Sequence, residues 1–172
     1  MERIEVSSKP STRGILKRIR LKYKDLAVLN IQKGGDLTAN DRILTTVFVN
    51  DQDRALKFYT ETLGFVKKSD VSAEGYRWLT VVSPDDQDGT ELLLELNDNP
   101  VARTYQKGMF EQDLPAASFG VEDTRAEYER LKAQGVKFTL EPMEVVAGVT
   151  IAVLDDTCGN LIQIQTLQGL ST

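Results

Sequence analysis

Hydrophobic and polar residues follow the same order twice along this chain. In each copy an apolar run ends at an aspartate, Asp51 or Asp123, and a stretch with helical spacing of its apolar residues follows. Each stretch ends at a glycine, Gly64 or Gly135, the residue that most often terminates a helix. Short apolar runs bounded by turn residues come next and are typical of strands. The pattern therefore predicts two copies of a β-α-β-β-β unit.

The expected elements can be placed by residue number. The first copy should contain a strand at 43–49, a helix at 51–63 and strands at 65–71, 76–83 and 91–97. The second should contain a strand at 116–121, a helix, and strands at 137–140, 149–154 and 160–167, with a candidate extra strand at 143–146. A capping box, Thr124-x-x-Glu127, marks the start of the second helix, and a further helix at 101–112 should connect the copies. We expect an α+β fold in which two βαβββ modules supply two half-sheets that face each other, with a site between them.

The first 41 residues differ in composition from the rest of the chain. Residues 1–40 hold nine Lys or Arg and four Asp or Glu, a net charge of +5, whereas the other 132 residues carry −10. We interpret residues 1–41 as a basic extension and linker, and residues 42–172 as one domain. Alternation at Arg18–Lys24 predicts a strand, although Ile15–Ile31 could instead form a basic amphipathic helix. Such a segment could bind nucleic acid or an acidic membrane surface. We interpret it instead as a frayed extension, or as one that docks on the acidic surface of the domain.

Composition limits the classes of protein to consider. No apolar run approaches the length of a membrane span, no apolar core of a signal peptide is visible in residues 1–20, and the lone Cys158 excludes an internal disulfide. The acidic domain disfavours nucleic acid as a partner and would attract cations. We therefore expect a cytoplasmic protein whose domain contacts neither membrane nor nucleic acid.

Strand parity predicts which side chains meet a ligand, because alternate residues face opposite sides of a sheet. Leu92, Leu94 and Leu96 should pack on the first helix, and Ile162 and Ile164 on the second. Glu95 and Gln163 should then lie at the centre of the open face. Glu95 is a tentative general base or cation partner, since a carboxylate between leucines is costly to desolvate. The predicted wall of this site is Leu44, Thr46, Phe48, Leu93, Ala116, Ser118 and Leu161.

Several motifs resemble the vicinal oxygen chelate superfamily, which includes glyoxalase I, bleomycin-resistance proteins and extradiol dioxygenases. They are Val49-x-Asp51-x-x-x-Ala55-x-x-Phe58-Tyr59-x-x-x-Leu63-Gly64-Phe65, Glu95-Leu96, Val121-x-Asp123 and Asp155-Asp156-x-x-Gly159-Asn160-x-Ile162-Gln163-Ile164. The resemblance covers residues 42 to about 168. It implies the glyoxalase/bleomycin-resistance fold, in which two βαβββ modules form curved, mixed but mainly antiparallel sheets around a cup. It also implies a homodimer.

The resemblance also implies four positions at which metal-dependent members hold their ion. These positions fall at Leu44, Glu95, Ala116 and Gln163 in this chain. Leucine and alanine offer no lone pair, and the chain has no histidine, so we expect no metal and no other cofactor. Weak binding of an ion by Glu95 and Gln163 alone stays open.

Two functions follow from these expectations. The first is a metal-free protein of the bleomycin-resistance type that binds a small organic molecule, aromatic or cationic. The alternative is a glyoxalase-like lyase or isomerase that uses Glu95 as a general base, so whether the protein is an enzyme is left open. The role of residues 1–40 and the identity of the ligand are open as well.

Overall fold

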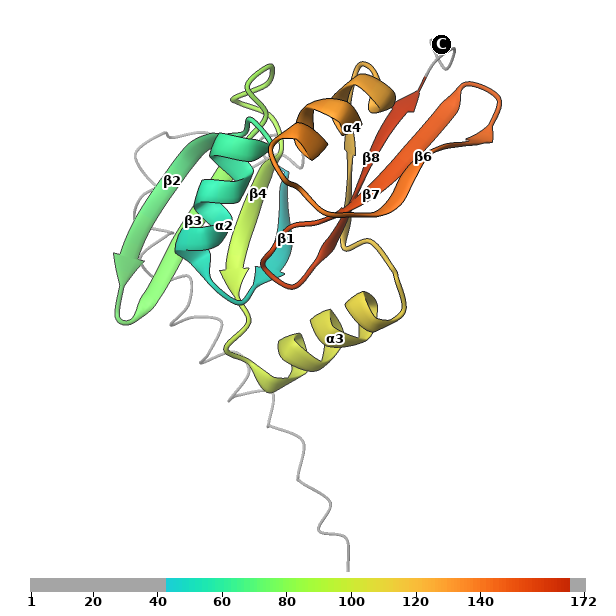
Figure 1. Ribbon diagram of the computed structural model, residues 1–172. Coiled ribbons are helices and arrows are strands. Elements are labelled where there is room, and N and C mark those ends of the chain that lie inside the picture. The colour runs from blue at the N-terminus through green and yellow to red at the C-terminus, as the bar shows by residue number, and fades with distance from the viewer. Residues whose placement is uncertain (1–42, 168–172) are drawn as a thin grey trace, which may run out of the picture. The chain divides into compact units, whose positions relative to one another are not determined.

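The computed structural model describes residues 43–167, and the account below concerns this part of the chain. The predictions for Arg18–Lys24 and Ile15–Ile31 lie outside the described residues. The described strands form two four-stranded sheets, with strand orders β1-β4-β3-β2 and β5-β8-β7-β6. Each sheet contains one parallel pair, β1 with β4 and β5 with β8, next to antiparallel neighbours. The predicted class of two βαβββ modules with mixed sheets is therefore confirmed (Figure 1).

The first module follows the predicted order of elements. It comprises strand β1 (Leu44–Val49), helix α2 (Gln52–Lys57), a π-helical turn η1 (Phe58–Thr62) and strands β2 (Val66–Ala73), β3 (Tyr76–Val82) and β4 (Glu91–Leu96). The carboxylate of Asp51 caps α2 by accepting a hydrogen bond from the backbone N–H of Arg54 at 3.0 Å. Gly64 adopts a φ of 83° and ends the helical segment, as expected.

The second module repeats this order with two departures from the prediction. It comprises strand β5 (Ala117–Gly120), helix α4 (Thr124–Ala133) and strands β6 (Phe138–Val146), β7 (Val149–Asp155) and β8 (Leu161–Leu167). The segments predicted at 137–140 and 143–146 form one strand, β6, whose register shifts twice between Phe138 and Met143. Such irregularities are typical of β-bulges, which interrupt the alternation that sequence patterns reveal.

The predicted capping residue of α4 was wrong by one position. Asp123 is the N-cap, since its carboxylate accepts from the backbone N–H groups of Arg125 and Ala126 at 2.8 and 3.2 Å. Thr124 is instead buried, and its hydroxyl lies 3.0 Å from the carbonyl oxygen of Thr150 and 2.8 Å from the hydroxyl of Thr166. A buried hydroxyl needs such partners, and strands β7 and β8 supply them.

A third helix, α3 (Pro100–Glu111), connects the two modules. Asn99 caps it through a 2.9 Å bond from the N–H of Val101, and Pro100 occupies the first helical position. Ala102 and Gln106 are its buried residues, so this side of the helix faces the modules.

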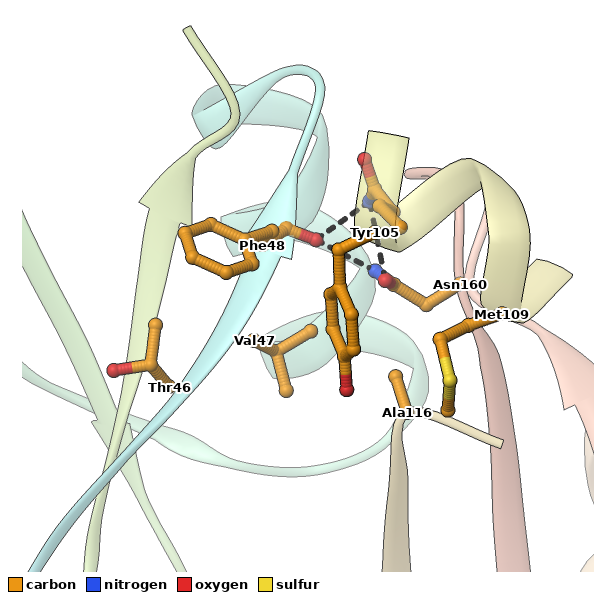
Figure 2. A pocket seen from close by; sticks show the side chains of 8 residues that line it. Thr46, Val47, Phe48, Tyr105, Met109, Ala116 and Asn160 are labelled. Carbon is orange, nitrogen blue, oxygen red and sulfur yellow. Dashed lines mark hydrogen bonds between the residues drawn. The ribbon is translucent and has the colours of Figure 1, made fainter. Parts of the chain in front are cut away.

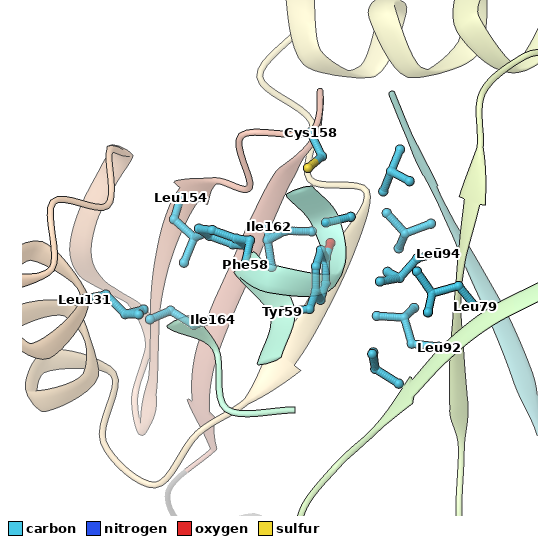
Figure 3. Close-up of a cluster of buried hydrophobic side chains, with 14 of the residues drawn as sticks. Phe58, Tyr59, Leu79, Leu92, Leu94, Leu131, Leu154, Cys158, Ile162 and Ile164 are labelled. Atoms are coloured by element: carbon cyan, nitrogen blue, oxygen red, sulfur yellow. The ribbon is translucent and has the colours of Figure 1, made fainter. Parts of the chain in front are cut away.

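Both modules contribute to a single hydrophobic core. Leu92 and Leu94 of β4 and Ile162 and Ile164 of β8 are buried in it, as strand parity predicts. The prediction was wrong for Leu96, which is 41 % exposed because it is the last residue of β4. Phe58 and Tyr59 of the η1 turn belong to the same core, and Figure 3 shows Tyr59 between the two sets of side chains. Each fully buried side chain of this size contributes about 1.5–3 kcal/mol through removal from water, so the core holds the modules together.

No helix within residues 43–167 combines the length and the apolar character that crossing a bilayer requires.

Candidate functional site

The face of the first sheet opposite α2 carries the residues predicted to meet a ligand. On β1, Leu44 and Thr46 are exposed and Phe48 is half-buried, whereas Val47 and Val49 point into the core. Phe48 pairs in register with Glu95 of β4, which is half-buried too. Leu93, on the same face of β4, is 2 % exposed. Strand parity thus predicted correctly which side chains of β1 and β4 face away from the core. That these side chains contact a ligand stays a prediction.

The open face of the second sheet is polar. Gln163 of β8 pairs in register with Ser118 of β5, and its side-chain amide donates to the Ser118 hydroxyl at 3.0 Å and to the Gln165 carbonyl at 3.1 Å. Ser118 is exposed, whereas Leu161 on the same face is buried. The side chains of Gln163, Ser118 and Gln165 are uncharged, so they offer hydrogen bonds but neither an acid nor a base.

The positions at which metal-dependent relatives would hold an ion do not fit one. Leu44, 44 % exposed, and the half-buried Ala116 have no lone pair to donate, which leaves only Glu95 and Gln163. Those two lie on different sheets, β4 and β8. Within residues 43–167 no group of three or more His, Cys, Asp or Glu side chains is arranged to hold a metal ion. A divalent ion would lack the oxygen or nitrogen ligands that it normally requires.

A cavity of about 290 Å³ lies between β1, the connecting helix α3 and the start of the second module (Figure 2). Three of its lining positions, Thr46, Phe48 and Ala116, belong to the predicted wall. The others are Val47, Tyr105, Gln106, Met109 and Asn160. Glu95, Gln163, Leu44, Leu93, Ser118 and Leu161 do not line it. The structure thus brings part of the predicted wall together around a space that α3 completes.

Gln106 holds α3 against both modules. Its side-chain nitrogen lies 2.7 Å from the carbonyl oxygen of Phe48, 3.0 Å from that of Cys158 and 3.1 Å from the side-chain oxygen of Asn160. Its side-chain oxygen accepts from Asn97 at 2.6 Å. The residue is 6 % exposed, so these bonds satisfy an amide that would otherwise be costly to bury.

Asn160 completes the polar base of the cavity. Its side-chain nitrogen donates to the Phe48 carbonyl at 2.8 Å (Figure 2). The same nitrogen donates to the carboxylate of Asp156 at 2.7 Å. Because Gln106 and Asn160 share the Phe48 carbonyl and bond each other, most of their hydrogen-bonding capacity is used inside the protein.

Asp156 is a fully buried carboxylate next to this base. One oxygen accepts from the N–H groups of Cys158 and Asn160 at 2.7 and 2.9 Å, and the other accepts from the Asn160 amide and from the Tyr59 hydroxyl at 3.2 Å. Burial raises the pKa of Asp156, and the hydrogen bonds oppose that rise. All four bonds are donated to the carboxylate, so its role is to fix the turn that positions Cys158 and Asn160.

Cys158 is not equipped as a nucleophile. Its side chain is fully buried, and burial, followed by the charge of Asp156, raises the pKa of the thiol. A thiolate, the reactive form, is therefore disfavoured at neutral pH.

Sequence reasoning missed five residues that line the cavity: Val47, Tyr105, Gln106, Met109 and Asn160. Strand parity says nothing about α3, because that helix belongs to neither module. One signal was available in the sequence. Gln106 stands four residues after Ala102, on the buried side of the helix, where a polar residue indicates a required hydrogen-bonding role.

Comparison with known proteins agrees with this architecture. The sequence profile of the Glyoxalase/Bleomycin resistance protein/Dioxygenase superfamily matches residues 41–164. An uncharacterised Bacillus subtilis protein, YurT, is 62 % identical over 122 residues, which are 71 % of this chain and 95 % of YurT. A probable lactoylglutathione lyase of Vibrio parahaemolyticus is 33 % identical over 73 % of this chain and 91 % of its own length.

Solved structures place the fold in the same group. TnmS3, an antibiotic binding protein from Streptomyces sp. CB03234, superposes with a TM-score of 0.59 at 25 % identity, over 78 % of this chain and 99 % of TnmS3. The profile match, the order of elements in both modules and this similarity agree with one another. The chain belongs to the Glyoxalase/Bleomycin resistance protein/Dioxygenase superfamily.

Proposed function

We propose that this protein binds a small organic molecule without the help of a metal ion. The observation that carries the proposal is the cavity between β1 and α3, whose walls are mainly apolar and aromatic. Concave, largely apolar sites with a few polar groups are the usual form of small-molecule sites. The side chains of Leu44 and Ala116, at two of the positions implied for metal ligands, support a site without metal.

Similarity to TnmS3 supports the same class of function, because that protein is described as antibiotic binding. At 25 % identity the similarity supports binding of a small molecule and does not identify which one.

A lyase is the alternative, and the similarity to the Vibrio parahaemolyticus protein favours it. In this alternative Glu95 acts as the general base that removes a proton next to a carbonyl group. The half-buried position of Glu95 on β4, opposite Phe48, is compatible with access to a substrate.

Two measurements on the purified full chain test the main proposal. Elemental analysis should find less than stoichiometric tightly bound metal, and a thermal-shift screen of small molecules should give ligands whose effect survives a chelator. Stoichiometric metal that is required for binding would contradict the proposal.

The substitution Glu95→Gln separates binding from catalysis, because it keeps the shape of the side chain and removes its charge. Affinity for a cationic ligand held by that charge should fall by about 1–3 kcal/mol. If Glu95 is a catalytic base, turnover in a lactoylglutathione lyase assay should fall while binding survives. Glu129→Gln is the matched control, because Glu129 is an exposed carboxylate of α4 that lies on neither sheet.

A cytoplasmic location and a homodimeric state, both expected from the sequence, complete the proposal. Of the two, the oligomeric state can be measured directly on the purified protein, as argued below.

A further inference from the structure

The size of the cavity restricts what it can hold. Its volume is about 290 Å³, and a cavity of roughly 150 Å³ in a protein core accommodates one benzene molecule. A ligand portion of about two fused rings therefore matches the space. Larger molecules could place only part of their structure inside it.

The lining restricts the charge of the ligand. None of the eight side chains that line the cavity is ionisable at neutral pH. The two amides at its base, Gln106 and Asn160, are already bonded to each other and to the Phe48 carbonyl. An ionised group placed here would lose part of its hydration without gaining an opposite charge, which is unfavourable.

Two hydroxyl groups can still hydrogen-bond to a ligand. Thr46 is exposed and Tyr105 is 54 % exposed, and neither hydroxyl bonds another described residue. Each can donate to, or accept from, an uncharged carbonyl or hydroxyl of the ligand.

The connecting helix supplies one wall of the cavity. Tyr105 and Met109, one turn apart on α3, project toward Ala116, while Phe48 lies across from them on β1 (Figure 2). A tyrosine ring and a thioether are favourable neighbours for an aromatic ring, through edge or stacked contacts and through sulfur contacts.

From these observations, and resting on the proposed binding function, we propose that the cavity binds an uncharged aromatic group of about two fused rings. Tyr105 and Met109 of α3 select this group, and Glu95 takes no part in holding it. Carbonyl or hydroxyl substituents on the rings are bound by Thr46 and Tyr105. The ligand is thereby assigned to the neutral aromatic class rather than to the cationic one.

Three naphthalene derivatives of similar shape test the ligand class on the full chain: 2-acetylnaphthalene, 2-naphthoate and 2-naphthylmethylammonium. Binding is followed by probe fluorescence and checked by calorimetry. The uncharged probe should bind at least about tenfold more tightly than either charged probe. Its affinity should change by less than about twofold between low and high salt, since no ion pair is involved.

Variants of the lining test the location. Tyr105→Ala should weaken binding of 2-acetylnaphthalene by about tenfold, and Ala116→Phe should abolish it by filling the cavity. Phe110→Ala is the matched control, because Phe110 is an exposed aromatic residue of the same helix that does not line the cavity. Melting curves verify the fold of each variant. If Ala116→Phe does not fold, the location of the site is tested by Tyr105→Ala alone. This variant should fold, because the side chain of Tyr105 is exposed.

Two results would overturn this inference. One is undiminished binding of the uncharged probe in Tyr105→Ala. The other is preferential binding of the ammonium probe that Glu95→Gln abolishes, which would leave the proposed binding function intact and move its site to the open face of β4. Failure of the proposed function itself is distinguishable, because the small-molecule screen with metal analysis would then give no metal-independent ligand.

Discussion

At the scale of single residues, the hydrogen bonds to the buried carboxylate of Asp156 should have a measurable effect on stability. The Tyr59 hydroxyl donates to it at 3.2 Å, and Tyr59 itself is fully buried in the core. Tyr59→Phe keeps the ring and removes this donor, so the free energy of unfolding should fall by about 1–2 kcal/mol at neutral pH. Tyr105→Phe is the matched control, because it removes an exposed hydroxyl that bonds no described residue.

The penalty of Tyr59→Phe should depend on pH. Burial holds the pKa of Asp156 above its ordinary value, so the folded state binds its proton more readily than the unfolded state does. Stability from this group is therefore lost as pH rises from about 3.9 through the raised pKa of the folded state. The hydrogen bond from the Tyr59 hydroxyl lowers the pKa of Asp156, because it stabilises the charged carboxylate. Urea unfolding should show a smaller penalty at acidic pH, where Asp156 is protonated, than at pH 7. An equal penalty at both would contradict this account.

The sequence predicted correctly which residues are buried where they lie inside strands, because side chains alternate between the two faces of a sheet. Leu92, Leu94, Ile162 and Ile164 are buried in the core because alternation fixes the face of each side chain. The cavity depended instead on the placement of α3, which involves contacts between residues far apart in the sequence, such as Gln106 with Phe48 and Cys158. Local patterns carry no information about such contacts, so Tyr105 and Met109 were not predicted.

At the scale of elements, the contact between α3 and the turn before β8 depends on Gly159. This residue has a φ of 98°, and a Cβ atom added to it would lie 2.9 Å from the side-chain nitrogen of Gln106. Gly159→Ala should therefore strain the turn and displace Gln106, with a loss of about 1–3 kcal/mol in the free energy of unfolding. Gly120→Ala is the control, because no atom lies within 4 Å of its added Cβ. Equal melting temperatures for the two variants would show that the contact is unimportant.

Element boundaries were predictable from the sequence to the extent that caps and glycine stops define them. Gly64 and Gly135 end their helices with φ values of 83° and 85°, as expected. The π-helical turn at Phe58–Thr62 was not predictable, since one wider turn, marked by the bond from the Leu63 N–H to the Phe58 carbonyl, leaves the apolar spacing unchanged. Thr124 was mistaken for a cap because its tertiary partners, Thr150 and Thr166, lie on strands that follow it.

At the scale of the whole molecule, the domain from residue 42 onward should fold without the basic extension. The family profile begins at residue 41, and YurT aligns over 95 % of its own length with only 71 % of this chain. Deletion of residues 1–38 should therefore change the melting temperature of the domain by only a few degrees, about what 1 kcal/mol would cause. A loss of solubility or a much lower melting temperature would show that the extension is part of the fold.

The match to the family profile leaves residues 1–40 outside it. If the extension has a separate role, its removal should leave binding of 2-acetylnaphthalene unchanged, since every residue that lines the cavity lies within residues 46–160. A changed affinity would instead tie the extension to the site.

The last prediction concerns the oligomeric state. Large apolar side chains are exposed along α3 and the segment after it, at Val101, Phe110 and Leu114, and on β1 at Leu44. Strands β1 and β5 stand at the ends of their sheets. Exposed apolar side chains and open sheet edges favour association, and a two-fold dimer covers the same surface on both copies.

Size-exclusion chromatography coupled to light scattering should therefore give twice the chain mass of 19.2 kDa at micromolar concentration. Val101→Asp is a suitable disruptive variant. Val101 is 76 % exposed, and an acidic residue near the start of a helix favours the helix itself. If α3 lies in the interface, this variant should shift the protein toward the monomer without lowering its melting temperature at high dilution. A monomeric wild-type protein would contradict the prediction of a dimer, and an unaffected dimer in the variant would place the interface elsewhere.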